Sequence, residues 1–286
     1  MTSHAAGSHG QGAGGGRFVG QHVLITGAGT GIGRAIALRL AAEGATLSLL
    51  ARDVQRLHAT LAEAVSAGAP PAHFAAACDV RDRASVDAAV AEAARRHGPL
   101  YAAIANSGIG GANAAPAPDA GPGAEPDRFE DLVATNLNGT YYLFRASERH
   151  LAPRPEAGFG ARHLVAIASI LARIGVAGYT GYCASKAGVT GLVRALAMEL
   201  APREVQVNAL CPGWVDTSMA RQGLEGLGRA LGISPDAAHA LAMKDVPLGR
   251  MSAPEDIAGV VAWLLSPDAR GVTGQALDVN GGAFML

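Results

Sequence analysis

The chain has 286 residues, of which 49% are hydrophobic and 16% are charged, and its formal net charge at pH 7 is −1. A chain of this size and hydrophobicity can bury the core of one α/β domain without disulfide bonds. The near-zero charge excludes nucleic acid as a partner, because no surplus of basic side chains exists to neutralise phosphates. No apolar stretch reaches the roughly 18 residues needed to span a bilayer, so no membrane partner is predicted.

The cysteines Cys78, Cys183 and Cys211 are scattered and lack the spacing of metal ligands. An odd, unpatterned set indicates reduced thiols rather than a disulfide framework. The N-terminus has no basic region followed by an apolar one, which a secretion signal would show. These features predict a cytoplasmic protein with no metal site.

Glycine, alanine, serine and histidine dominate the first residues of the chain. Such a composition cannot bury enough apolar surface to offset the entropy lost on ordering. Residues 1–17 are therefore predicted to be a disordered tail, with His4 and His9 as solvated side chains, and residues 18–286 to be a single domain.

Apolar strand patterns alternate with helix patterns through the rest of the chain. The predicted strands are 22–26, 45–51, 72–78, 100–106, 163–169, 205–210 and 275–279. This alternation, with nearly continuous apolar strands, predicts a parallel sheet covered by helices on both faces. The expected fold is α/β, a single doubly wound domain with a seven-stranded parallel sheet. The proline-, alanine- and glycine-rich segments 112–126 and 153–160 are predicted to be surface loops of this domain.

A glycine-rich turn follows the first predicted strand and precedes a helix pattern. Strand, glycine turn and helix in this order form the first unit of a dinucleotide-binding fold, where backbone N–H groups at a helix N-terminus approach a pyrophosphate. The spacing is Thr-Gly-x-x-x-Gly-x-Gly, and the alternative is a flexible loop. The candidate binding residues of the turn are Gly27, Gly29, Thr30, Gly31 and Ile32.

Tyr182 and Lys186 are four residues apart in a predicted helix over 178–200, so they project from the same face. An unperturbed phenol titrates near pKa ~10, and a neighbouring ammonium favours the phenolate, which brings the group closer to a working pH. The pair is thus a candidate for acid/base chemistry. The alternative for this pair alone is an ordinary surface contact.

Further motifs occur along the chain, and the whole set is Thr26-Gly27-x-x-x-Gly31-x-Gly33, Asn106-Ser107-Gly108, Asn136, Ser169, Tyr182-x-x-x-Lys186 and Pro212-Gly213-Trp214-Val215-Asp216-Thr217. In its order and approximate spacing this set resembles the short-chain dehydrogenase/reductase family, from about Gly20 to the C-terminus. Two places differ from the usual family pattern: Ala105-Asn106-Ser107-Gly108 replaces Asn-Asn-Ala-Gly, and Ala168-Ser169 replaces Ser-Ser. Asn106 and Ser169 are retained in both.

The resemblance implies a hydride transfer between a nicotinamide and a ketone or secondary alcohol, and a Rossmann fold. It implies that Tyr182 supplies the proton and Ser169 holds the carbonyl oxygen. Lys186 would lower the pKa of Tyr182 and hold the nicotinamide ribose, and Asn136 would anchor a water. The remaining implied cofactor contacts are Asp79, Val80, Asn106, Gly108, Pro212, Gly213, Val215 and Thr217. Taken singly, Ser169 could merely end a strand and Asn136 could bond to nearby backbone.

The end of the second predicted strand bears on the choice of cofactor. A carboxylate there binds the ribose hydroxyl of NAD, whereas an arginine attracts the extra phosphate of NADP. The slot that NAD-preferring members fill with aspartate holds Ala51, and Arg52 follows it. The sequence therefore favours NADP(H) over NAD(H). Asp53 remains an alternative ribose contact, unless it caps the following helix.

The segment 217–246 occupies the position of the family's substrate lid. Its apolar residues suit an apolar ketone, or they pack the lid onto the domain. They are Met219, Leu224, Leu227, Leu231, Ile233, Leu241 and Met243. Ser234 and Pro235 are predicted to start a helix within it. Arg173, Arg221 and Arg229 are candidates for steering an anionic carrier, or are solvated.

The sequence from Leu210 to Met219 and the long lid resemble 3-oxoacyl-thioester and polyketide ketoreductases within the family. The favoured function is NADPH-dependent reduction of a 3-oxoacyl thioester or similar apolar ketone. The alternatives are an NAD-dependent secondary alcohol or cyclic diol dehydrogenase, and a catalytically silent NADP(H)-binding sensor. A metal-dependent hydrolase lacks a ligand cluster. The apolar helix patterns 129–150 and 179–200, together with the family resemblance, suggest a homotetramer.

Overall fold

The computed structural model of the protein describes residues 16–69, 72–113, 127–153 and 162–285. Seven strands form one sheet, in the order β3-β2-β1-β4-β5-β6-β7, and every neighbouring pair is parallel. The strands are β1 (His22–Thr26), β2 (Thr46–Ala51), β3 (Phe74–Ala77), β4 (Ala102–Ala105), β5 (Arg162–Ile167), β6 (Val205–Pro212) and β7 (Ala276–Val279). The predicted fold class is confirmed, and each predicted strand is present within a few residues of its expected bounds.

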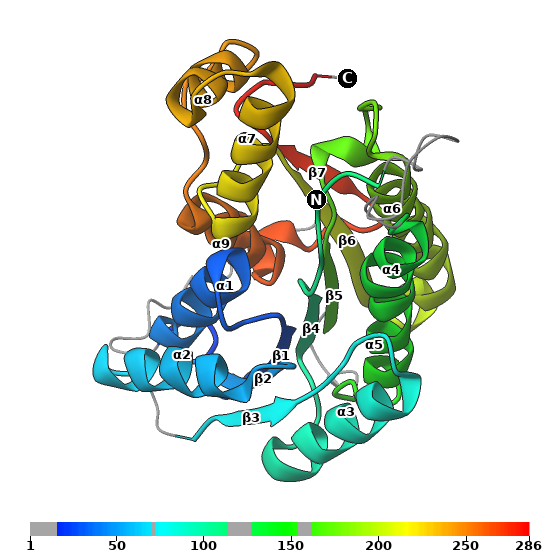
Figure 1. Ribbon diagram of the computed structural model, residues 1–286. Coiled ribbons are helices and arrows are strands. Elements are labelled where there is room, and N and C mark those ends of the chain that lie inside the picture. The colour runs from blue at the N-terminus through cyan, green and yellow to red at the C-terminus, as the bar shows by residue number, and fades with distance from the viewer. Residues whose placement is uncertain (1–15, 70–71, 114–126, 154–161, 286) are drawn as a thin grey trace, which may run out of the picture.

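Helices cover both faces of the sheet (Figure 1). One core cluster joins the sheet to α1 (Gly31–Ala42), α2 (Val54–Ser66) and α9 (Pro254–Leu264). The other joins it to α3 (Arg83–His97), α5 (Gly139–Glu148) and α6 (Thr180–Leu200). Every residue of β1, β4, β5 and β6 is buried, because these central strands have a helical layer on either side.

The order of the strands creates a crevice at one edge of the sheet. The chain runs outward from β1 to β2 and β3, and then returns to β4 on the other side of β1. In open α/β sheets a ligand binds at this switch point, outside the carboxyl ends of the strands. The carboxyl ends of β1, β4, β5 and β6 therefore define where a site is expected.

Two further groups of helices flank this carboxyl edge. α4 (Phe129–Val133) continues through a π-helical turn, Ala134–Asn138, into α5. α7 (Ser218–Leu231) and α8 (Pro235–Met243) contact each other and form a lobe at the top of Figure 1. Ser234 caps α8 with Pro235 in its first turn, as predicted.

Two predicted boundaries change. The helix with Tyr182 begins at Thr180 rather than at 178, because Gly178 has a φ of +78° and lies outside the helical region. Of the predicted tail, Gly16 and Arg17 lie in the described part, and the Arg17 guanidinium pairs with Glu43. His4, His9 and most of the two predicted loops lie outside the described residues.

Candidate active site

The glycine turn after β1 is held against the end of β4. Asn106 Nδ2 donates hydrogen bonds to the carbonyls of Thr26 (3.2 Å) and Gly27 (3.0 Å). The backbone N–H groups of Asn106 and Ser107 both donate to Thr26 Oγ1 at 3.1 Å. A Cβ at Gly33 would overlap both Asn106 Nδ2 and the Gly27 carbonyl, so the close approach of the two strand ends requires glycine there.

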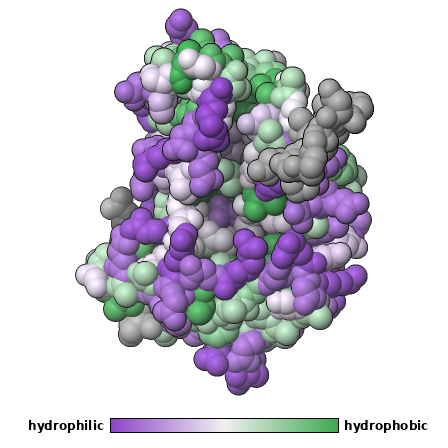
Figure 2. Space-filling view, viewed as in Figure 1, coloured by the Kyte–Doolittle hydropathy of each residue, from purple (hydrophilic) through white to green (hydrophobic). Residues whose placement is uncertain are grey.

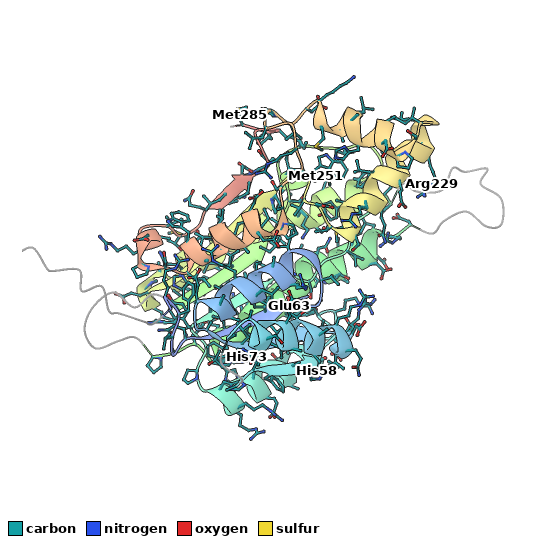
Figure 3. All side chains as sticks on the ribbon, turned by 90° about the vertical axis from the view of Figure 1, so that its left-hand side faces the viewer. His58, Glu63, His73, Arg229, Met251 and Met285 are labelled. Carbon is teal, nitrogen blue, oxygen red and sulfur yellow. The ribbon has the colours of Figure 1, made fainter. Side chains whose placement is uncertain are left out.

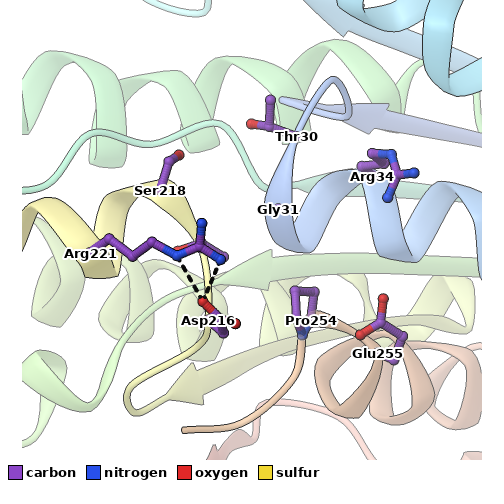
Figure 4. A pocket seen from close by; sticks show the side chains of 9 residues that line it. Thr30, Gly31, Arg34, Asp216, Ser218, Arg221, Pro254 and Glu255 are labelled. Carbon is purple, nitrogen blue, oxygen red and sulfur yellow. Dashed lines mark hydrogen bonds and ion pairs between the residues drawn. The ribbon is translucent and has the colours of Figure 1, made fainter. Parts of the chain in front are cut away.

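The N-terminus of α1 opens onto a cavity of about 330 Å³ (Figure 4). Thr30 is the N-cap residue, and its side chain makes no capping hydrogen bond. The first backbone N–H groups of a helix have no partner within the helix, so those of α1 are available to an anion. The lining residues are Thr30, Gly31, Arg34, Asp216, Thr217, Ser218, Arg221, Pro254 and Glu255.

Gly31 brings this turn close to the segment after β6. Its φ is +51°, and a Cβ built on it would lie 3.0 Å from Thr217 Cγ2. A side chain at position 31 would therefore fill the space between α1 and Thr217. An unfilled cradle of this kind, beside a helix N-terminus, fits the pyrophosphate of a dinucleotide.

The end of β2 separates the roles of Arg52 and Asp53. The Asp53 carboxylate accepts a hydrogen bond from the Arg56 backbone N–H at 3.3 Å, which caps α2, and pairs with the Arg56 guanidinium at 3.0 Å. Asp53 is thus engaged by its own helix. Arg52 is exposed and has no ion pair among the described residues, although its charge is one of the causes that lower the pKa of Asp79. The guanidinium at this strand end is available to a phosphate.

Asp79 and Val80 follow β3. Arg81 donates hydrogen bonds to the Asp79 carboxylate, including one of 2.7 Å, and these lower the pKa of Asp79 to about 2. Val80 is 7% exposed and lies against Gly139, where a Cβ would be 2.8 Å from Val80 Cγ2. The Asp79 side chain is therefore an ionised, oriented acceptor at the edge of the crevice.

Asn136 lies in the π-helical turn between α4 and α5 and is 1% exposed. Its amide exchanges two hydrogen bonds with the backbone of Ile109, with the Ile109 N–H donating at 2.9 Å and Asn136 Nδ2 donating to the Ile109 carbonyl at 3.0 Å. Nδ2 also donates to Ser185 Oγ at 3.1 Å. A Cβ at Gly108 would lie 3.1 Å from Asn136 Oδ1 and 3.4 Å from Lys186 Nζ. Asn136 therefore joins the β4 loop to α6.

Tyr182, Lys186 and Ser169 come together at the carboxyl end of β5. Lys186 Nζ donates a hydrogen bond of 2.8 Å to the carbonyl of Ile167, the last residue of β5. It lies 5.7 Å from the centroid of the Tyr182 ring. The Ser169 side chain, 7% exposed, accepts a hydrogen bond from the Leu171 N–H at 3.1 Å and lies close enough to the Tyr182 hydroxyl to lower its pKa.

The pKa shifts differ from the sequence prediction for this pair. Burial raises the pKa of Tyr182, and the hydrogen bond from Ser169 opposes that rise. Ser169 is a neighbour that lowers the Tyr182 pKa, whereas the Lys186 ammonium is directed at the Ile167 carbonyl. Burial lowers the pKa of Lys186 to about 8. At neutral pH the pair holds a neutral phenol, which is able to donate a proton, beside an ammonium.

The segment after β6 completes the crevice. The Gly213 N–H donates to the Val279 carbonyl at 3.1 Å, and a Cβ on Gly213 would lie 3.0 Å from Asn280. The Thr217 hydroxyl donates to the Val215 carbonyl at 3.2 Å and caps α7 by accepting from the Ala220 N–H at 3.3 Å. The hydroxyl predicted to contact a cofactor therefore also has a structural role.

The apolar residues of the predicted lid divide into two groups. Leu224 and Met243 are buried, so they pack the lobe together. Met219 is 44% exposed, and its Sδ would lie 3.1 Å from a Cβ on Gly110, a position 3.8 Å from the Tyr182 ring. Figure 2 shows a hollow between the α7–α8 lobe and the side of the molecule with α4 and α6. Met219 thus brings an apolar side chain near Tyr182.

The three candidate arginines differ. Arg173 is not solvated, because it pairs with Asp278 at 3.3 Å and donates to the Ala276 carbonyl. Arg221 pairs with Asp216 at 2.9 Å (Figure 4). Arg229 is exposed near the C-terminal end of α7 (Figure 3). The ion pairs leave Arg173 and Arg221 poorly placed to bind a carrier.

Two residues that sequence reasoning did not single out support the site. Ser185 Oγ donates to the Tyr182 carbonyl at 2.9 Å and accepts from Asn136. Its position three residues after Tyr182, on the same helix face, was a usable signal. Asn113 accepts a hydrogen bond from the Gly181 N–H, and no sequence motif marks it.

Within the described residues, no group of three or more histidine, cysteine, aspartate or glutamate side chains could hold a metal ion. In the same part of the chain, no helix is long and apolar enough to cross a bilayer.

Comparison with known proteins places the chain among reductases. A family model described as "Enoyl-(Acyl carrier protein) reductase" matches residues 27–283. The chain is 38% identical over 261 residues to a putative ketoacyl reductase of Streptomyces coelicolor, covering 91% of this chain and 95% of the relative. It is 34% identical to a 3-oxoacyl-[acyl-carrier-protein] reductase of Pseudomonas aeruginosa, with 93% and 98% covered.

Two solved structures are also similar. A variant of actinorhodin polyketide ketoreductase with NADPH matches with a TM-score of 0.80 and 36% identity, over 92% of this chain and 97% of that one. Levodione reductase matches with a TM-score of 0.80 and 32% identity, over 93% of this chain and 98% of that one.

Proposed function

We infer that this chain, which belongs to the short-chain dehydrogenase/reductase family, is an NADPH-dependent ketoreductase that reduces a 3-oxoacyl thioester or a similar apolar ketone. The observation that carries the proposal is the place of the Tyr182 hydroxyl, next to Ser169 and Lys186, at the switch-point edge of the sheet. A protein that only binds the cofactor does not need a buried proton donor at this position.

A bound nicotinamide supplies the hydride for such a reduction. The residues of the chain supply the proton and the geometry. Tyr182 donates its hydroxyl proton to the oxygen that develops negative charge, and Ser169 donates a hydrogen bond to the same oxygen. Ser169 lies next to the Tyr182 hydroxyl, so both hydroxyls can turn their protons toward the same substrate oxygen.

Reprotonation of Tyr182 requires a route through neighbouring polar groups. Lys186, with a pKa of about 8, is close enough to neutral pH to exchange protons. Gly108 lies beside both Lys186 Nζ and Asn136 Oδ1, so these two groups flank one small space. We assign Asn136 and Lys186 to this route, and Lys186 also to the nicotinamide ribose.

We assign the cofactor-binding residues from the open space between the N-terminus of α1 and Thr217. Gly27, Gly29, Thr30, Gly31 and Ile32 would hold the pyrophosphate at the N-terminus of α1. The adenine would contact Asp79 and Val80, and the nicotinamide would lie by Asn106, Gly108, Pro212, Gly213, Val215 and Thr217. The preference for NADPH rests on Arg52, since Asp53 is engaged as the cap of α2.

The substrate class rests on two observations. The names of the two relatives given above describe them as reductases of ketoacyl and 3-oxoacyl groups. Met219 gives the space beside Tyr182 an apolar wall. The likeness to levodione reductase favours a second candidate, a cyclic ketone or the corresponding secondary alcohol, with the same residues acting in either direction.

We also propose a homotetramer in the cytoplasm. Apolar side chains exposed on the α4–α6 side, such as Met198 at 80% and Phe129 at 41%, are suited to a contact between copies. Sedimentation of the purified chain tests the number of copies.

The function is tested by titrating the protein with NADPH and NADH by fluorescence, and then following the absorbance of the reduced nicotinamide with a panel of 3-oxoacyl thioesters and cyclic ketones. Oxidation of NADPH by a thioester supports the proposal. Preference for NADH with turnover of an alcohol or diol would make the chain a dehydrogenase of that class. Tight binding without turnover on any panel member would favour a cofactor-binding sensor.

A further inference from the structure

The helix that carries Tyr182 lacks a cap of its own. The N-cap residue of α6 is Tyr179, whose side chain makes no capping hydrogen bond. The first intrahelical bond runs from the Cys183 N–H to the Tyr179 carbonyl at 2.8 Å, so the earlier N–H groups need partners from elsewhere. One of them belongs to Gly181, the residue immediately before Tyr182.

Asn113 supplies the missing cap from a distant part of the chain. Its Oδ1 accepts a hydrogen bond from the Gly181 N–H at 2.8 Å, across a sequence separation of 68 residues. Its Nδ2 donates to Thr180 Oγ1 at 3.1 Å, and its backbone N–H donates to the Gly178 carbonyl at 2.8 Å. The Asn113 side chain is buried, with 4% exposed, so water does not replace these bonds readily.

Asp127 fixes the orientation of the Asn113 amide. Asp127 Oδ1 accepts from Asn113 Nδ2 at 3.1 Å and from the Phe129 N–H at 2.9 Å. Turning the amide over would point its oxygen at the carboxylate and its NH₂ at the Gly181 N–H, and both bonds would be lost. The carboxylate therefore holds the capping oxygen toward α6.

Close packing makes the first turn of α6 sensitive to this cap. A Cβ on Gly181 would lie 3.0 Å from Leu132 Cδ1 and 3.1 Å from Phe129 Cα, so the turn sits directly on α4. The contact leaves little freedom for Gly181 while the cap is in place. Loss of the cap would free the turn, and with it the backbone of Tyr182.

We propose that Asn113 is a positioning residue, which holds the first turn of α6 so that the Tyr182 hydroxyl stays against Ser169. The proposal rests on the proposed function, in which Tyr182 donates the proton. Because Asn113 touches neither Tyr182 nor the cofactor cradle through any contact described above, its effect falls on turnover. Displacement of a reacting group by about 1 Å can lower a rate by about 10²-fold.

The test compares Asn113→Ala, Asn113→Asp and the exchanged pair Asn113→Asp with Asp127→Asn. The alanine variant removes the cap. The single aspartate opposes two carboxylates. The exchanged pair restores an acceptor toward Gly181 and a donor between the two side chains, and loses only the bond that Asp127 Oδ1 accepts from the Phe129 N–H. Ser266→Ala is the matched control, because Ser266 caps a short helical turn, Pro267–Ala269, at the opposite edge of the sheet.

We expect kcat to fall by about 10-fold or more in Asn113→Ala and in Asn113→Asp, with the NADPH dissociation constant within about twofold of wild type. The exchanged pair should recover kcat to within about threefold. Amide hydrogen exchange at Gly181 should accelerate in Asn113→Ala and not in Ser266→Ala, whose kcat should equal that of the wild type.

Wild-type kcat in Asn113→Ala, or an exchanged pair as slow as the single aspartate variant, would overturn the positioning role. If the alanine variant does not fold, the comparison of the two aspartate variants decides. A Tyr182→Phe variant measured alongside separates the two claims, since turnover retained in that variant means that the proposed function itself is wrong.

Discussion

Buried ionisable groups occur at both edges of the sheet, but their surroundings differ. At the carboxyl edge, burial raises the pKa of Tyr182 and lowers the pKa of Lys186 to about 8. Both residues lie beside glycines, Gly108 and Gly110, where the absence of a side chain leaves space next to a polar group. A reacting molecule has room to enter at this edge.

At the amino edge, burial lowers the pKa of His163 to about 3 and raises the pKa of Tyr101 to about 12. The Tyr101 hydroxyl donates to the Leu265 carbonyl, and His163 Nε2 bonds the Tyr101 oxygen at 3.1 Å. His22 is likewise held, with 2.9 Å from Nδ1 to the Gly98 carbonyl and 2.8 Å from Nε2 to Ser48 Oγ. Tyr101 and His163 bond each other, and His22 bonds Gly98 and Ser48, so these groups hold the strands together.

The comparison shows that a shifted pKa does not by itself identify an active site. The pKa shifts at His163 and Tyr101 have the same main cause as those at Tyr182 and Lys186, because burial is the largest contribution to each of them. What separates the two edges is open space beside the shifted group. Variants at the two edges should therefore give opposite results, with activity lost at one and acid stability changed at the other.

The largest effect is expected for Lys186→Met. Its kcat should fall by about 10²–10⁴-fold, because an acid/base partner is removed. The folded pKa of about 8 lies below the ordinary 10.5, so at neutral pH the buried ammonium destabilises the fold, and this penalty disappears between pH 8 and 10.5. The variant should therefore gain up to about 3 kcal/mol of unfolding free energy at pH 7. Urea unfolding at pH 7 and pH 10 measures both the gain and its loss.

His163→Leu should give the opposite pattern, with unchanged kcat. The pKa of His163 is about 3 in the folded state and 6.5 ordinarily. Between these two pH values the unfolded state therefore binds a proton that the folded state does not bind. Wild-type stability should fall as the pH drops below 6.5, with about 2 kcal/mol lost to this residue at pH 5. In His163→Leu that part of the slope should vanish in unfolding curves at pH 7 and pH 5. An unaltered slope would contradict the account of the amino edge.

Arg52→Ala tests the cofactor end of the crevice and has a smaller effect. Loss of a charge-assisted contact to the extra phosphate should raise the NADPH dissociation constant by about 10-fold or more and leave that of NADH unchanged. Arg95→Ala is a suitable control, because Arg95 pairs with Glu92 on α3 and lies outside the crevice. An equal loss of affinity for NADPH and for NADH in Arg52→Ala would mean that Arg52 does not bind the extra phosphate of NADPH.

Much of the fold was predictable, because its signals are local. Continuous apolar runs marked the strands, and Ser234-Pro235 marked the start of α8. The turn at Gly27–Gly33 was recognisable because its glycines are required where Asn106 packs against it. Asn106 itself directly follows another strand, β4. Parallel strands bring such strand ends to one edge by rule.

Other features depend on contacts that no local pattern encodes. Spacing placed Lys186 beside Tyr182, but it could not show that the ammonium bonds the Ile167 carbonyl or that burial raises the Tyr182 pKa. The choice between Arg52 and Asp53 needed the cap of α2. Asn113 was missed because its partner, Gly181, is distant in sequence.

The most direct test of the account is the Tyr182→Phe variant, assayed for oxidation of NADPH with the best 3-oxoacyl thioester of the panel and for NADPH affinity. The phenyl ring keeps the packing, and the substitution removes only the hydroxyl next to Ser169. We predict a kcat at least about 100-fold below wild type, with an NADPH dissociation constant within about twofold. A kcat close to that of wild type would contradict the assignment of Tyr182 as the proton donor.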